Sequence, residues 1–121
     1  MSHSLKYGAS GKFGGTHTED RMILTPGRIL TDENCSEMDA QIKEAIEQNK
    51  TEIIIDCTSL GFLDSAMLEM LIQAHSALKS RGGRLKIIRL NDVCRDILLA
   101  TRTIKLFFVY KDMQEAMAYT P

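Results

Sequence analysis

The sequence predicts an α/β domain with a mixed, mostly parallel sheet of four or five strands and about four helices packed against it. From residue 21 onward, short apolar runs alternate with segments in which apolar residues recur at helical spacing. Residues 53–55 are three consecutive isoleucines, a composition that suits a strand covered on both faces, as in parallel sheets. The length of 121 residues suits one domain.

The first residues differ in composition from the rest of the chain. Residues 1–16 are rich in glycine, serine and threonine, which predicts a flexible segment that can hold an edge strand near residues 5–13. We expect the folded domain to cover 17–121. Its first strand, over 21–25, stops at the turn pair of Pro26 and Gly27. No helix separates this strand from the preceding segment, so the two can pair antiparallel.

The remaining elements follow from periodicity and from helix caps. In chain order we expect a helix over 32–49, a strand over 52–57, a helix over 64–81, a strand over 84–90, a helix over 92–101, a strand over 106–110 and a short helix over 112–118. Gly82 and Gly83 supply the stop of the second helix, and Asp112 with Glu115 has the spacing of a capping box. The residues expected to be buried are Ile53, Ile54, Ile55, Leu68, Leu71, Ile87 and Val109.

Charge and cysteine content exclude several classes of protein. The 15 Lys and Arg residues and 16 Asp and Glu residues give a net charge of −1, whereas nucleic-acid binding needs a basic surface. No apolar run reaches the ~18–20 residues of a membrane helix, and the N-terminus lacks the apolar stretch of a signal peptide. We therefore expect a cytoplasmic protein without membrane insertion. Cys35, Cys57 and Cys94 form no CxxC pair, so we expect reduced, mostly buried thiols and neither a zinc site nor a disulfide framework.

The stretch from residue 53 to 70 carries the chemistry. A buried strand ends at Asp56, a short loop follows, and Asp64 with Ser65 opens the second helix. Functional sites of parallel sheets form in the loops after the carboxyl ends of strands. Unpaired N–H groups and the helix dipole stabilise an anion at a helix N-terminus. A hydroxyl in this first turn can therefore carry a phosphate, although Asp-Ser before an apolar helix is also the ordinary pattern of an N-cap.

Several pieces of the chain, in order, resemble the STAS domain family, which is named for sulfate transporters and anti-sigma factor antagonists. They are IIID (53–56), GFLDS (61–65), GGRLKII (82–88), DVCRDILLA (92–100) and FFVYKDMQEAM (107–117), and the resemblance covers about 21–118. It implies that the fold is a single STAS domain. The chain departs from the family pattern after Ser65, where Ala66 and Met67 replace a small hydroxyl residue and a glycine.

The resemblance also implies a function. In the antagonists, the serine after the aspartate is phosphorylated by a partner that is both anti-sigma factor and serine kinase, and a serine phosphatase reverses this. The unphosphorylated form binds the kinase and so regulates sigma-factor-dependent transcription. Ser65 is the corresponding phosphorylation site. The partner-binding residues expected from this comparison, with Met67 and Met70 partly exposed at the mouth of the site, are Asp56, Asp64, Ser65, Ala66, Met67 and Met70.

Alternatives to this interpretation stay open. The chain could be a constitutive STAS subunit of a lipid-transport or other signalling complex that lacks a phospho-switch, and it can form a homodimer. An enzyme or nucleotide-binding protein is disfavoured because no phosphate loop and no nucleophile–base arrangement is present, so we expect no catalysis, cofactor or metal. His75 lies on the apolar face of its helix, which favours a structural role. Asp56 fits a strand-end residue bonded to loop amides better than a Mg²⁺ ligand.

Overall fold

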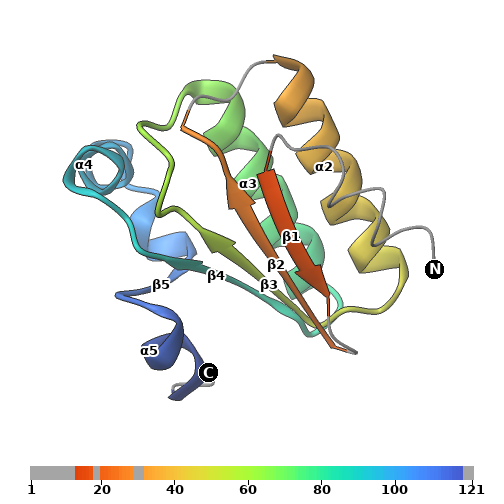
Figure 1. Ribbon diagram of the computed structural model, residues 1–121. Coiled ribbons are helices and arrows are strands. Elements are labelled where there is room, and N and C mark those ends of the chain that lie inside the picture. The colour runs from red at the N-terminus through yellow and green to blue at the C-terminus, as the bar shows by residue number, and fades with distance from the viewer. Residues whose placement is uncertain (1–12, 18–19, 29–31, 119–121) are drawn as a thin grey trace.

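The computed structural model describes residues 13–17, 20–28 and 32–118 (Figure 1). Its elements in chain order are β1 (Phe13–His17), β2 (Arg21–Pro26), α2 (Asp32–Glu47), β3 (Glu52–Asp56), α3 (Ser65–Lys79), β4 (Arg84–Ile88), α4 (Asp92–Ala100), the 3-10 turn η1 (Ile104–Leu106), β5 (Phe108–Tyr110) and α5 (Met113–Ala118). This order confirms the alternation of strands and helices predicted from residue 21 onward.

The five strands lie in the sheet in their sequence order. β2, β3, β4 and β5 run parallel, and β1 pairs antiparallel with β2. The predicted mixed, mostly parallel sheet is therefore confirmed. The register of β1 opposite β2, with Phe13 facing Pro26, places this strand later than the edge strand expected near 5–13, of which residues 5–12 lie outside the described part. Residues 13–16, expected to be flexible, belong to the sheet because β2 supplies their hydrogen-bond partners.

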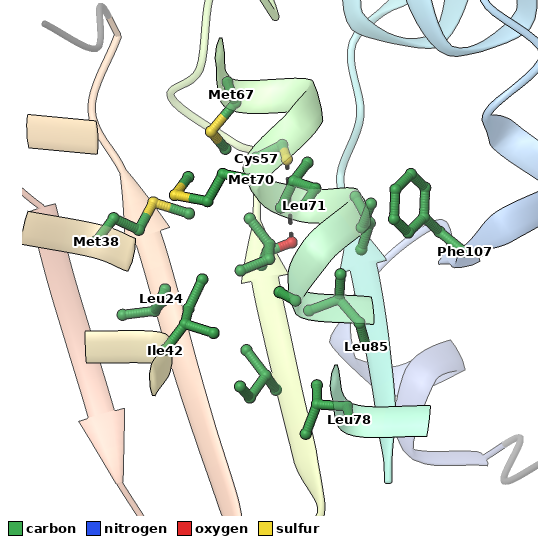
Figure 2. Packing of buried hydrophobic residues seen from close by; sticks show 14 of the residues in the cluster. Leu24, Met38, Ile42, Cys57, Met67, Met70, Leu71, Leu78, Leu85 and Phe107 are labelled. Atoms are coloured by element: carbon green, nitrogen blue, oxygen red, sulfur yellow. Dashed lines mark hydrogen bonds between the residues drawn. The ribbon is translucent and has the colours of Figure 1, made fainter. Parts of the chain in front are cut away.

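Helices α2 and α3 cover one face of the sheet and enclose the main core (Figures 1 and 2). Successive side chains of a strand point to opposite faces, so Ile53 and Ile55 enter this core while Ile54 enters a smaller cluster under α5. All three isoleucines are fully buried, as their consecutive placement predicted. The predicted burial of Leu71 and Ile87 is confirmed as well, whereas Leu68 and Val109 are only partly buried at the margin of the core.

Helix ends follow the predicted signals. Gly82 has a φ of +78° after the end of α3, a conformation that glycine adopts without strain. Asn91 caps α4 by accepting a hydrogen bond from the Cys94 N–H at 2.8 Å. Asp112 accepts from the Glu115 N–H at 2.9 Å, while the Glu115 carboxylate accepts from the N–H of Lys111 rather than of Asp112. This is the predicted capping box with its return bond shifted by one residue.

The second face of the sheet contains a buried charge cluster. The Lys86 side chain is 1% exposed, and its Nζ lies 2.7 Å from Oε2 of Glu52. Lys86 also donates to the Ala116 carbonyl of α5 at 2.6 Å, and Arg21 Nε lies 2.6 Å from Oε1 of Glu52. Burial alone would raise the pKa of Glu52, but the hydrogen bonds from Lys86 and Arg21 hold this pKa below its usual value. Lys86 thus fastens α5 to the sheet.

None of the helices among the described residues combines the length and the apolar composition needed to cross a membrane.

Candidate functional site

The candidate site lies where the chain leaves β3 and enters α3, at the carboxyl edge of the parallel strands. Asp64 is the N-cap of α3: its backbone is extended, and its Oδ1 accepts a hydrogen bond from the Met67 N–H at 2.8 Å. Ser65 is the first residue of the helix. Asp64, Ser65 and Ala66 are all exposed, so the structure brings these three predicted residues together on one surface.

The Ser65 hydroxyl is open to solvent and bonds to none of the described residues. The cap is supplied by Asp64 instead, which leaves the serine oxygen available to an external enzyme. The first turn of α3 contains no acidic side chain, and its amides carry the partial positive charge of a helix N-terminus. An anion attached to Ser65 would therefore meet favourable helix amides on one side and the Asp64 carboxylate on the other.

Asp56 lies beneath the loop and holds it rather than facing outward. Its side chain is 14% exposed. Its Oδ1 accepts hydrogen bonds from the Thr58 N–H at 3.0 Å and from the Thr58 hydroxyl, and its Oδ2 lies 3.0 Å from a nitrogen of Arg89. The expectation that Asp56 is a strand-end residue bonded to a loop amide is confirmed. Any effect of Asp56 on a partner would therefore act through the loop that it positions.

Two further hydrogen bonds fix the path of the loop. The Leu60 carbonyl accepts from the Asn91 side chain at 2.9 Å, which ties the loop to the N-terminus of α4. The Gly61 N–H donates to the Arg28 carbonyl at 2.9 Å. A Cβ at position 61 would lie 3.2 Å from the same carbonyl oxygen, so the close approach of the two backbones favours glycine. The loop that presents Ser65 is thus anchored to β2–α2 and to α4.

The structure corrects the expectation that Met67 and Met70 are partly exposed. Met67 is 1% exposed and Met70 is 7% exposed, and Figure 2 shows both pointing from α3 into the cluster that contains Leu24 and Met38. The inward face of α3 is Met67, Met70, Leu71, Ala74 and Leu78. This face is rotated by about one residue from the predicted face through Leu68 and Leu71, because the cap at Asp64 and the packing against α2 set the helix rotation.

The exposed apolar group of the loop before Ser65 was not predicted as a site residue. Phe62, three residues before Ser65, is 45% exposed. Phe62 lies between Leu60 and Leu63, which are buried at 1% and 5%. The sequence signal that could have indicated Phe62 is a single aromatic residue between two leucines, just before the N-cap Asp64.

The three cysteines and His75 play structural roles. Burial raises the pKa of the Cys57 thiol, with smaller contributions from Cys94 and Asp56, and burial raises the pKa of Cys94. Cys57 and Cys94 are buried, Cys35 is half-buried, and none of the three is bridged. His75 packs its ring edge against Phe107, with centroids 5.7 Å apart at 79°. Its placement against the core agrees with the predicted structural role.

Comparison with known proteins identifies the family. A family model described as the STAS domain matches residues 15–116, and the chain therefore belongs to the STAS domain family. No curated protein sequence matches the chain significantly.

Solved structures share the fold at low sequence identity. Thermotoga maritima TM1081 superposes with a TM-score of 0.82 at 20% identity, covering 92% of this chain and 96% of that chain. An anti-sigma-factor antagonist (STAS) domain protein from Planctomyces limnophilus gives 0.76 at 17%, covering 88% and 95%. The unphosphorylated anti-sigma factor antagonist SpoIIAA, from Bacillus, gives 0.76 at 20%, covering 87% and 92%.

Proposed function

We propose that this STAS-domain protein is an anti-sigma factor antagonist, a binding protein whose affinity for an anti-sigma factor with serine kinase activity is switched by phosphorylation of Ser65. The observation that carries the proposal is the exposed Ser65 hydroxyl at the first residue of α3, directly after the N-cap Asp64. Structures of SpoIIAA in unphosphorylated and phosphorylated forms both match this fold, with TM-scores of 0.76 and 0.71. The protein would act in the cytoplasm, and a serine phosphatase would reset it.

A phosphate on Ser65 would change the surface charge without unfolding the domain. It would add about −1.5 to −2 charges. The helix N-terminus favours this anion. The neighbouring Asp64 carboxylate already accepts the Met67 N–H at 2.8 Å, so its charge would repel the phosphate and direct it outward. The new charge would therefore stand on the exposed surface that a partner would contact.

The partner-facing surface would consist of Asp64, Ser65 and Ala66 together with the exposed Phe62 of the loop. Phe62 would make the apolar contact with the partner, because Met67 and Met70 are buried and cannot make it. A partner surface that fits the bare hydroxyl would bury the phosphate without compensation. An uncompensated buried charge costs about 3–5 kcal/mol, which is a loss of affinity of roughly 150- to 5,000-fold.

The test compares three forms of the protein against the purified anti-sigma kinase. Ser65→Ala should bind as tightly as the unphosphorylated protein, and Ser65→Glu should bind about a hundred-fold or more weakly while remaining folded by circular dichroism. Ser76→Glu, at an exposed serine further along α3, is the matched control and should bind normally. Mass spectrometry after incubation with the kinase and ATP should find phosphate on Ser65.

The opposite result has a definite meaning. If the kinase leaves Ser65 unmodified and Ser65→Glu binds like Ser76→Glu, no phospho-switch operates at this position. The chain would then be a constitutive STAS subunit of a lipid-transport or other signalling complex, in keeping with the replacement of the family's hydroxyl residue and glycine by Ala66 and Met67.

A further inference from the structure

A cleft of about 350 Å³ lies at the far end of α3 from Ser65. It is bounded by the end of α3, the start of β4, η1 and the start of β5, and its lining residues are His75, Lys79, Gly83, Arg84, Lys105, Leu106, Phe107 and Phe108. His75 and Ser65 are ten residues apart on the same helix, or roughly 15 Å along its axis. The cleft is therefore separate from the candidate switch. Its volume falls in the range of small-molecule sites.

The cleft collects positive charge. Lys79, Arg84 and Lys105 come from three different elements, and none of the described residues that line the wall is a carboxylate. Lys79 and Lys105 are exposed and form no ion pair with the described residues. Like charges repel when they gather on one small surface, so an anion placed between these cations would reduce their repulsion. Low-dielectric walls strengthen the attraction.

The walls of the cleft are apolar and aromatic. Leu106 is 42% exposed, Phe108 is half-buried, and Phe107 is buried against the ring edge of His75. Nδ1 of His75 is buried and has no hydrogen-bond partner among the described residues. A ligand with both an apolar body and an acidic group would contact the exposed apolar side chains and the lysines of the cleft together.

We propose that this cleft binds a small aromatic anion, with the acidic group between Lys79 and Lys105 and the ring against Leu106 and Phe108. This site is separate from Ser65 in space. Because both lie on α3, a metabolite bound in the cleft would contact the same helix that presents Ser65. The cations supply attraction for the anion, and the aromatic wall distinguishes an organic anion from inorganic phosphate.

His75 gives the site a pH dependence. Burial, and secondarily the positive charge of Lys79, lower its pKa and so favour the neutral imidazole. The other charged groups that line the cleft beside it are Arg84 from β4 and Lys105 from η1, both cationic. A bound anion favours the imidazolium, so the pKa of His75 should rise in the complex.

The experiment is a ¹H–¹⁵N NMR titration of the full chain with phenyl phosphate. Backbone signals of residues 75–84 and 104–108 should shift with a single dissociation constant. Inorganic phosphate, which has the charge without the ring, and benzyl alcohol, which has the ring without the charge, should each bind at least about tenfold more weakly. Equal binding by either compound would overturn the assignment of an aromatic anion.

Charge-removing variants locate the site. Lys79→Gln and Lys105→Gln should each weaken phenyl phosphate binding about three- to fivefold, a loss reduced by the exposure of both side chains. Lys43→Gln removes the same charge from a lysine side chain that is 69% exposed on α2 and should leave the affinity unchanged. Equal affinities in all three variants, or shifts confined to residues around Ser65, would refute the proposal.

Discussion

Replacing Lys86 by methionine should cost about 2–4 kcal/mol of unfolding free energy. Its Nζ makes a 2.7 Å ion pair with Glu52 and a 2.6 Å hydrogen bond to the Ala116 carbonyl, and the side chain is 1% exposed. Each charged hydrogen bond contributes about 1.5–3 kcal/mol. Methionine refills most of the volume, and Arg21 stays paired with Glu52 at 2.6 Å, so the net cost lies below the sum of the two bonds.

A double-mutant cycle isolates the pair. Glu52→Gln leaves a buried ammonium without its counter-charge, which should cost about 3–5 kcal/mol. The double variant Lys86→Met/Glu52→Gln should cost less than the sum of the single variants by about 1–3 kcal/mol, because the Lys86–Glu52 pair is lost only once. Urea unfolding measures all four proteins, and hydrogen exchange in α5 should rise in Lys86→Met because the anchor of Ala116 is lost.

The control is the same substitution at the surface. Lys43 pairs with Asp39 at 2.9 Å, but its side chain is 69% exposed, so Lys43→Met should change stability by less than about 0.5 kcal/mol. The Lys86–Glu52 pair does not stabilise the domain if Lys86→Met costs no more than Lys43→Met, or if the coupling energy between Lys86 and Glu52 is below about 0.5 kcal/mol.

The pair of Lys86 and Glu52 also predicts how the stability of the domain changes in acid. Because the pKa of Glu52 is held below its ordinary value of 4.5 in the folded state, its contribution is present above pH 4.5 and is lost as the pH falls through the lower folded pKa. Glu52→Gln should therefore lose stability less steeply than the parent below pH 4.5. Identical slopes in the two proteins would contradict the lowered pKa.

Three further outcomes are expected. Met67→Ala should lower the unfolding free energy by about 2–5 kcal/mol, whereas the adjacent exposed Ala66→Ser should stay within about 0.5 kcal/mol by urea unfolding; similar costs would mean that α3 is rotated differently. Phe62→Ala should leave the thermal midpoint nearly unchanged and weaken the complex with the anti-sigma kinase in calorimetry, and an unaltered affinity would remove Phe62 from the interface. Because the pKa of His75 is lowered in the folded state, the unfolded chain takes up its proton first as the pH falls below 6.5, so His75→Gln should flatten the loss of stability below that pH. A slope unchanged by the substitution would show that His75 does not titrate differently on folding.

The sequence alone determined the order of the helices and strands from residue 21 onward and the place of the candidate site, because these signals are local, although β5 begins at Phe108 rather than at residue 106. Three consecutive isoleucines predicted a strand buried on both faces, and Ile53, Ile54 and Ile55 are all at 0% exposure. The stop at Gly82 and the cap at Asp112 are set by conformation and hydrogen bonds within a few residues. For the same reason, Asp64 and Ser65 could be placed at the start of a helix after a strand end.

Only the tertiary structure decided which side chains near Ser65 are exposed. The rotation of α3 depends on the helix and strands packed beneath it, so Met67 and Met70 enter the core and the exposed apolar group near Ser65 is Phe62. The burial of Lys86 depends on Glu52 and on Ala116, which are 34 and 30 residues away along the chain. The cleft likewise joins residues from α3, β4, η1 and β5. Periodicity reports one element at a time, whereas these features arise from contacts between elements that no local pattern encodes.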